Sequence, residues 1–350
     1  ATAALERSSE PDVVRWAQLE LVTSLMHQRL HAFPEAIASA RLAREHARGL
    51  DPAPMWLLIS TETRIGSAMQ ADGDSEGSRA HLERALAWQL ELKGEQHPAT
   101  ANILFELASL HIVNLHEIDE GISLAKRVVE ILDRPDYGPT VAAAEAHEIL
   151  AYTYLSLQRT DDARQSMQRT VELHDALYPR EHSRQLSTYT LRSNLAQAEG
   201  RPEEAWAWAE EGLLLANRTL GGSAPLTGSM SATAGQLALL QEKFEIAEQH
   251  FESAREIFEE VTGPDHPIMV EILTSLGNAR FGLGKAEDAR DCYRRALEIA
   301  GPGPARARPL IGLAHASDTP ADTIRYAELA REAEPGYASE VAALLKNTRR

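Results

Sequence analysis

Small residues recur along this chain at an almost constant interval, and this spacing limits the possible folds more than any other feature. Seven positions separated by 42 or 43 residues are Ala36, Ser78, Gly121, Ala163, Ala205, Ala247 and Ala289. Seven more lie twelve residues before them, at Ser24, Gly66, Ser109, Ala151, Ser193, Gly235 and Gly277. Two antiparallel helices approach closely only where the side chains at their crossing are small. The spacing therefore predicts one helical hairpin in every 42 residues.

Prolines mark the start of the hairpins with the same period. They are Pro11, Pro54, Pro98, Pro139, Pro225, Pro267 and Pro309, with Ser183 in the one gap. Proline in the first turn of a helix costs no hydrogen bond. In the repeat that starts at Pro267, apolar residues follow helical spacing on both sides of the turn GLGK at 282–285, and GPGP at 301–304 ends the second helix. Hairpins repeated in this way stack into a solenoid.

These patterns resemble tetratricopeptide repeats. The linkers GEQHP at 94–98 and GPDHP at 263–267 resemble those of kinesin light chain and its bacterial relatives. Residues 79–98 and the closing segment resemble the repeat regions that follow the catalytic domain in many bacterial serine/threonine kinases. The resemblance implies an all-α, right-handed superhelical solenoid of about seven repeats over residues 11–309. We expect this superhelix to form a domain at 1–318, with a degenerate last repeat and a capping helix at 319–350. Repeats three and four match least well, because Gly121, Val128 and Thr170 replace the usual alanines.

Composition excludes several classes of function. The chain carries 52 acidic against 35 basic residues, a net charge of −17, which argues against binding to nucleic acids or anionic membranes. The single cysteine, Cys292, excludes a disulfide scaffold and fits a reducing cytoplasm. No stretch is apolar enough to predict a membrane span, and the N-terminus has no apolar signal core. Since the chain does not begin with Met, we expect it to be part of a longer polypeptide.

Motifs for catalysis and metal binding are missing from the sequence. There is no glycine-rich kinase loop, His-Arg-Asp, Asp-Phe-Gly or Walker motif. The pair His147-Glu148 starts a zincin-like pattern, but Ala151 stands where the second histidine is needed. His97 and His266 lie in equivalent loops and are interpreted as loop or cap residues. Cys292 follows an acidic residue that would disfavour its thiolate, so it is interpreted as a packing residue. We therefore expect no enzyme, no cofactor and no metal.

The tetratricopeptide resemblance implies that the first helix of each hairpin lines a concave groove. In the last four repeats, the implied inward positions include Glu145, Glu148, Tyr152, Thr190, Asn194, Gln236, Glu271, Thr274 and Asn278. Asn194, Gln236 and Asn278 form a ladder of one carboxamide per repeat. A carboxamide both donates and accepts hydrogen bonds, so it can pair with the backbone of an extended peptide. The alternative is that these polar residues only keep an empty groove hydrated.

Charge indicates the kind of partner. Glu106, Glu145, Glu148 and Glu271 face inward by this register, and Arg64 is the only base expected nearby. This predicts a polar or basic protein segment as the partner, rather than an acidic one. The favoured function is a protein-interaction scaffold, the non-catalytic repeat region of a bacterial signalling protein such as a kinase. The alternatives are a repeat sensor that binds a peptide and controls transcription, and, least favoured, an enzyme hidden in the groove.

Overall fold

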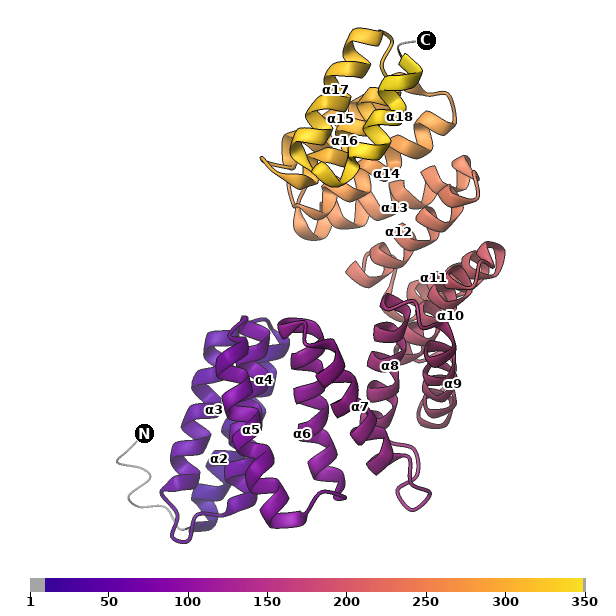
Figure 1. Cartoon of the computed structure of the whole chain (residues 1–350). Coiled ribbons are helices and arrows are strands. Elements are labelled where there is room, and N and C mark those ends of the chain that lie inside the picture. Colours follow the sequence, from indigo (N-terminus) through magenta and orange to yellow (C-terminus); the bar gives the residue numbers. More distant parts are fainter. Residues whose placement is uncertain (1–9, 349–350) are drawn as a thin grey trace. The chain divides into compact units, whose positions relative to one another are not determined.

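The computed structural model describes residues 10–348, which form 17 α-helices joined by short turns and contain no strand in that range (Figure 1). Contacts between residues divide the chain into two compact units, unit 1 ending at Leu177 and unit 2 beginning at Tyr178. Both are built from antiparallel helical hairpins, so the predicted all-α solenoid is confirmed. No helix within 10–348 is both long enough and apolar enough to cross a membrane.

Unit 1 consists of four hairpins, in which each first helix packs on the second helix of the same hairpin, and α4, α6 and α8 also pack on the second helix of the preceding hairpin. The pairs are α2 (Glu10–Arg29) with α3 (Phe33–Arg48), α4 (Met55–Asp72) with α5 (Ser75–Lys93), α6 (Pro98–Ser109) with α7 (Ile118–Leu132), and α8 (Val141–Ser156) with α9 (Thr160–Leu177). A π-helical segment, η1 (Leu110–Leu115), extends α6.

Unit 2 contains four further hairpins and a final helix. The pairs are α10 (Leu186–Ala198) with α11 (Pro202–Leu220), α12 (Pro225–Leu240) with α13 (Phe244–Thr262), α14 (Ile268–Gly282) with α15 (Ala286–Ile299), and α16 (Ala307–His315) with α17 (Pro320–Ala333). Short 3₁₀ turns, η2 (Ser183–Gln185), η3 (Pro304–Arg306) and η4 (Pro335–Tyr337), precede α10, α16 and α18 (Ala338–Thr348). The last helix, α18, packs its Val341 on Ala327 and Ala330 of α17. The boundary expected at residue 318 stays a prediction.

Close crossings between paired helices lie where the small-residue spacing predicts them. All seven second-helix positions, from Ala36 to Ala289, are buried. In two hairpins a hydroxyl spans the crossing: Ser24 Oγ donates to the carbonyl of Ala36 at 2.7 Å, and Ser193 Oγ donates to the carbonyl of Ala205 at 2.8 Å. Both bonds join residues twelve apart, which is the separation found in the sequence.

The poorest-matching repeat has its own reason for glycine. At Gly121 a Cβ would overlap the Cγ1 atom of Ile112, which belongs to the π-helical segment η1. A π-turn inserts an extra residue into a helix and changes where the following side chains point. Glycine at position 121 is therefore the residue that lets this hairpin close.

Three histidines at equivalent loop positions cap the helical segments that follow them. The Nδ1 atoms of His97, His182 and His266 accept hydrogen bonds from the backbone N–H groups two residues later, at 3.1, 3.1 and 3.3 Å. The interpretation of His97 and His266 as cap residues is thus confirmed. These rings satisfy N–H groups that the first turn of a helix leaves without a partner.

Turns within the first seven hairpins have a left-handed backbone. Seven residues, one in each of these hairpins and 42 or 43 apart, have positive φ angles: His31, Gly73, His116, Gln158, Gly200, Glu242 and Gly284. Three are glycines, for which this conformation is free of a Cβ clash. The other four residues hold it at a cost of about 1 kcal/mol each.

Unit 1 also buries a carboxylate that the repeat pattern does not reveal. The Glu62 side chain in α4 is 0% exposed and is surrounded by bases from α3 and α5. Its nearest partners are Arg44 Nη1 at 3.2 Å, His81 Nδ1 at 2.5 Å and Arg84 Nη1 at 3.0 Å. Burial alone would raise the pKa of Glu62, but the hydrogen bonds and charges of His81 and Arg44 hold it at about 2.

Replacing Glu62 with glutamine should destabilise the chain by about 3 kcal/mol, because it removes the buried negative charge on which Arg44, His81 and Arg84 converge. Chemical denaturation followed by circular dichroism measures the change. The matched control is Glu172→Gln, which removes a half-exposed partner of Arg169 and should cost at most about 1 kcal/mol. Equal stability of the two variants would contradict a structural role for Glu62.

The lowered pKa of Glu62 also predicts a pH dependence. Its contribution is fully present above the unfolded-state value of about 4.5 and is lost as the pH falls toward about 2. The melting temperature of the wild-type chain should therefore fall more steeply across this window than that of Glu62→Gln. Parallel curves would show that the pKa of Glu62 does not change on folding.

Glycine at a left-handed turn position should stabilise the fold. We expect Glu242→Gly to raise the free energy of unfolding by about 0.5–1 kcal/mol, because it removes the Cβ clash at a φ of 57°. The reciprocal change Gly284→Ala, at a φ of 75°, should lower it by a similar amount. Urea denaturation of both variants checks the pair, and the same sign for both would contradict the turn geometry.

Candidate functional site

The first helices of unit 2 enclose a hollow around Gln236, which we call the Gln236 hollow. Its volume is about 470 Å³, and it lies between α12 and α14. Polar groups around it come from Ser229, Thr233 and Gln236 on α12 and from Glu271 and Ser275 on α14. Aromatic and aliphatic side chains complete the lining, among them Phe251 and Phe258 of α13 and Ile268 of α14. The predicted positions Gln236 and Glu271 are thus brought together.

A second hollow, the Asn278 hollow, lies between α14 and α16 and has a volume of about 830 Å³. It is lined by the predicted residues Thr274 and Asn278. Its other lining residues are mostly apolar or aromatic and include Leu239, Phe244, Phe281, Tyr293, Ile311 and Tyr337. Apolar walls with a few polar groups are the usual composition of a ligand site.

Asn278 is oriented by a residue of the neighbouring helix. The Tyr293 hydroxyl on α15 donates to Asn278 Oδ1 at 2.8 Å. Burial raises the pKa of Tyr293 well above its ordinary value, so the phenol keeps its proton. The ring fits because it packs on Gly277 and Gly312, where any Cβ would overlap it. Asn278 therefore offers the hollow its Nδ2 donor, which bonds to nothing else within 10–348, while its oxygen is already engaged.

Arg308, at the start of α16, lines both hollows and was missed by sequence reasoning. It is exposed, and within residues 10–348 its guanidinium forms no hydrogen bond or ion pair. The sequence register named Arg64 as the only base near the inward acids, and Arg308 is a further base at the same hollow as Glu271. Arg308 was missed because it follows the last complete 42-residue repeat, where the small-residue spacing no longer assigns positions to a face.

The remaining predicted positions do not join these two hollows. Asn194 and Thr190 lie half-buried on α10, which contributes Gln197 to the Gln236 hollow instead. The hydroxyls of Thr190 and Thr274 each donate to the carbonyl four residues earlier in their own helix, at 3.1 and 2.6 Å. These two threonines can therefore offer a ligand only acceptor lone pairs.

Three predicted residues, Glu145, Glu148 and Tyr152, belong to α8 of unit 1 and are partly buried there. Glu106, from α6 of the same unit, has a carboxyl group whose pKa is raised above its ordinary value. Burial raises the pKa of Glu106, and the charge of Glu145 adds to this effect while Arg64 opposes it. Burial lowers the pKa of Arg64, whose Nη1 donates to Gln28 Oε1 at 3.3 Å. The first helices of unit 1 thus hold acidic groups around one base.

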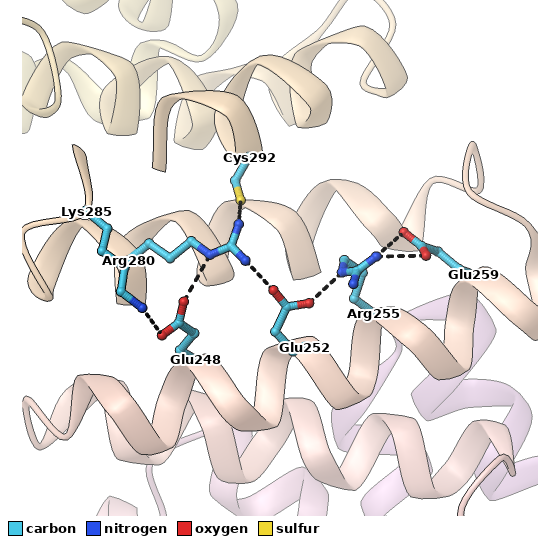
Figure 2. A network of polar contacts seen from close by, with 7 residues as sticks. All are labelled: Glu248, Glu252, Arg255, Glu259, Arg280, Lys285 and Cys292. Carbon is cyan, nitrogen blue, oxygen red and sulfur yellow. Dashed lines mark hydrogen bonds and ion pairs between the residues drawn. The ribbon is translucent and has the colours of Figure 1, made fainter. Parts of the chain in front are cut away.

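Cys292 is enclosed by a network of charges rather than exposed to a substrate (Figure 2). The thiol is 5% exposed, and Arg280 Nη1 lies 3.2 Å from its sulfur. Burial raises the pKa of the Cys292 thiol, and Arg280 only partly offsets this. A protonated, buried thiol is a poor nucleophile. The structure supports the interpretation of Cys292 as a packing residue.

Arg280 belongs to a line of alternating charges along α13 and α14. Lys285 Nζ lies 2.7 Å from Glu248, Arg280 pairs with Glu248 and Glu252, and Arg255 pairs with Glu252 and Glu259 (Figure 2). Each acid in the line therefore has a basic neighbour. The network joins adjacent hairpins and leaves none of these carboxylates as a candidate general base.

His147 is also engaged. Its Nε2 lies 2.8 Å from Asp133 Oδ2, and Arg169 approaches the other oxygen of Asp133 at 3.4 Å. Burial would raise the pKa of Asp133, but its bonds to His147 and the charge of Arg169 lower it. Among the described residues, no three His, Cys, Asp or Glu side chains are placed to hold a metal ion.

Comparison with known protein families identifies the repeat. A tetratricopeptide repeat model matches residues 57–134, 184–260 and 231–301, which together cover more than half of the chain. The chain belongs to the tetratricopeptide repeat family. A comparison with curated proteins found no match.

Solved structures show similarity in fold at low sequence identity. The apo form of RapI is 13% identical, with a TM-score of 0.69 over 95% of this chain and 97% of that one. A Rap protein complexed with Competence and Sporulation Factor is 15% identical, with a TM-score of 0.59 and the same coverage. A putative kinesin light chain from Podospora anserina is 18% identical, with a TM-score of 0.48 over 59% of this chain and 96% of that one. Identities this low extend the similarity to the fold only.

Proposed function

We propose that this tetratricopeptide chain is a protein-interaction scaffold that binds an extended polypeptide segment along the first helices of unit 2. The observation that carries the proposal is the pair of adjacent hollows joined by Arg308, each with a carboxamide, Gln236 or Asn278, at its edge. Corresponding residues of neighbouring hairpins recur at the repeat interval. A segment that extends across the hairpins would therefore meet one carboxamide in each hollow.

The lining of the hollows suits backbone recognition combined with apolar side chains. Gln236 offers both a donor and an acceptor, and Asn278 offers a donor fixed by Tyr293. The aromatic lining of the Asn278 hollow would bury one bulky side chain of the partner. A Rap conjugation gene regulator of plasmid pLS20, 12% identical with a TM-score of 0.54 over 82% of this chain and 74% of that one, was solved in complex with the Phr* peptide. That precedent supports a peptide as the class of partner.

Charge favours a partner that is polar or basic overall. Glu271 is exposed at the Gln236 hollow, and the chain as a whole carries a net charge of −17. Arg308 provides one position where an acidic group of the partner would be accepted. We also infer that the protein acts in the cytoplasm. A further inference is that the catalytic part of a signalling protein, such as a serine/threonine kinase, lies outside this chain.

A second candidate is a peptide sensor that controls transcription. It is supported by the Rap conjugation gene regulator of plasmid pLS20, which was solved in complex with the Phr* peptide. The sequence of the intact gene product separates the two: a kinase domain supports the first, and a DNA-binding domain or a free-standing repeat chain supports the second.

The groove is tested with a peptide selected against the wild-type chain from a random display library. We expect Gln236→Ala and Asn278→Ala each to weaken its binding about fivefold, the loss of one hydrogen bond of about 1 kcal/mol. Arg308→Ala should weaken the binding of peptides that contain an acidic residue and leave the binding of other peptides unchanged. Calorimetric titration measures each effect.

The matched control is Gln249→Ala on α13, whose exposed carboxamide lies outside both hollows. It should bind like the wild type. If the double variant of Gln236 and Asn278 remains folded and keeps full affinity, the groove is not the binding site.

A further inference from the structure

Two charged hollows lie between successive second helices of unit 1. One, of about 550 Å³, lies between α5 and α7 and is also lined by the helix before α7. The other, of about 490 Å³, lies between α7 and α9 and is also lined by α8. Three acids and two bases line each hollow, so both are negative when histidine is counted as neutral.

Equivalent positions between α3 and α5 carry mostly bases. Residues that line the α7–α9 hollow have their equivalents two repeats, or 85 residues, earlier in the sequence. The equivalents of its three acids are Arg48, Gly77 and Ala87, none of which is acidic. The charged residues among all the equivalents are Arg41, Arg44, Arg48, Glu62, Glu83 and Arg84. Four arginines against two glutamates make this surface positive, on a chain whose total charge is −17.

Three of these arginines converge on one point. Arg44 Nη1, Arg48 Nη2 and Arg84 Nη1 lie 3.2, 3.9 and 3.0 Å from the carboxylate of Glu62. We call these three residues the arginine cluster. Within residues 10–348, Glu62 is the only acidic side chain that forms an ion pair with any of them. One carboxylate has a single negative charge, so positive charge remains in excess at this point.

Most N–H donors of the arginine cluster are unused. A guanidinium has five N–H donors. Arg44 and Arg84 each donate one hydrogen bond to Glu62, and Arg48 is too far from Glu62 to donate any. The Nε atom of Arg44 is buried without a partner in the described part of the chain. The side chains of Arg48 and Arg84 are 56 and 43% exposed, so a ligand can reach their free donors.

We propose that the arginine cluster binds a phosphorylated side chain of a partner protein. Guanidinium groups that converge on one point suit a compact group with more than one negative charge. A phosphate monoester carries about −1.5 to −2 at neutral pH on three acceptor oxygens. Arginine also matches phosphate geometry, because it can donate two parallel N–H bonds.

A row of Asp or Glu residues in the partner would suit this surface less well. Each carboxylate has one charge, and an acidic segment would spread these charges along the second helices. The next two hollows on that path, between α5 and α7 and between α7 and α9, are negative and would repel it. The charges therefore favour one phosphate on a segment that is not otherwise acidic.

Glu62 acts as a positioning residue in this proposal. Its pKa of about 2 keeps it ionised at neutral pH, and it lies fully buried beneath the arginines. It fixes Arg44 and Arg84 through one donor each and leaves their other donors free. The site belongs to unit 1 and shares no residue with the two hollows of unit 2.

A random peptide library with one fixed phosphoserine tests the proposal on the whole chain. We expect the selected peptides to bind at least about tenfold more tightly than their unphosphorylated forms, the effect of one or more charge-assisted hydrogen bonds. Fluorescence anisotropy measures both affinities. Equal affinity of the two forms, or a library that yields no binder, would overturn the proposal.

Arg48→Ala should weaken the binding of the phosphorylated peptide about tenfold. Arg48→Lys should weaken it less, because lysine keeps the charge but loses the fork of donors. Circular dichroism should show an unchanged fold, since Arg48 is exposed and donates no hydrogen bond to Glu62. The matched control is Arg127→Ala on α7, which removes the equivalent of Arg84 from the negative α5–α7 hollow and should bind like the wild type. Equal losses in Arg48→Ala and Arg127→Ala would contradict the site.

Other anionic partners are separated by two further probes. A peptide with aspartate in place of phosphoserine should lose most of the affinity, and full binding by it would show that an acidic segment is the partner instead. Vesicles that contain phosphatidylserine should not sediment the chain, and Arg48-dependent sedimentation would overturn the proposal in favour of a lipid headgroup. The double variant of Gln236 and Asn278 should bind the phosphorylated peptide normally, so this result is independent of the groove in unit 2.

Discussion

The close crossing between paired helices is the contact on which the other features of this structure depend. Each crossing joins residues twelve apart, as the bonds from Ser24 to Ala36 and from Ser193 to Ala205 show. Because the side chains there are small, the two helices pack at short distance and the next first helix follows in the same orientation. Gln236 and Asn278, 42 residues apart, consequently line neighbouring hollows. The placement of the two hollows is thus a product of the packing between the helices that line them.

Sequence alone could predict the features that are local or that repeat. The crossings and the histidine caps each depend on a few residues at a fixed spacing, so the periodic pattern reveals them. The left-handed turns could not be predicted in this way, because four of the seven positions carry His, Gln or Glu instead of glycine. The charges around Glu62 could not be predicted, because they come from three helices and no repeat carries a copy. The hydrogen bond from Tyr293 to Asn278 could not be predicted either, because it requires the Tyr293 ring to pack on Gly277 and Gly312. Arg308 follows the last complete repeat, beyond the reach of the spacing.

Charged groups in this chain mainly join helices to one another. Glu62 is enclosed by bases from α3 and α5, and the line from Lys285 to Glu259 joins adjacent hairpins of unit 2 (Figure 2). A carboxylate held in this way has its pKa lowered, as for Glu62 and Glu248, and is a weak base. Glu106, by contrast, lies in α6 of unit 1, where burial raises the pKa of its carboxyl group.

The two ends of a stacked array face different requirements, because each internal hairpin is covered on both sides and the terminal ones are not. At the C-terminal end, α18 buries Val341 against α17 and exposes small or polar residues such as Ser339, Glu340 and Lys346. That helix is suited to contact with water. The described residues begin with α2, whose exposed Leu19 and Met26 have buried equivalents in the six repeats that follow. Hydrophobic burial is the main force in stacking, so these two positions carry the packing between hairpins in the rest of the array.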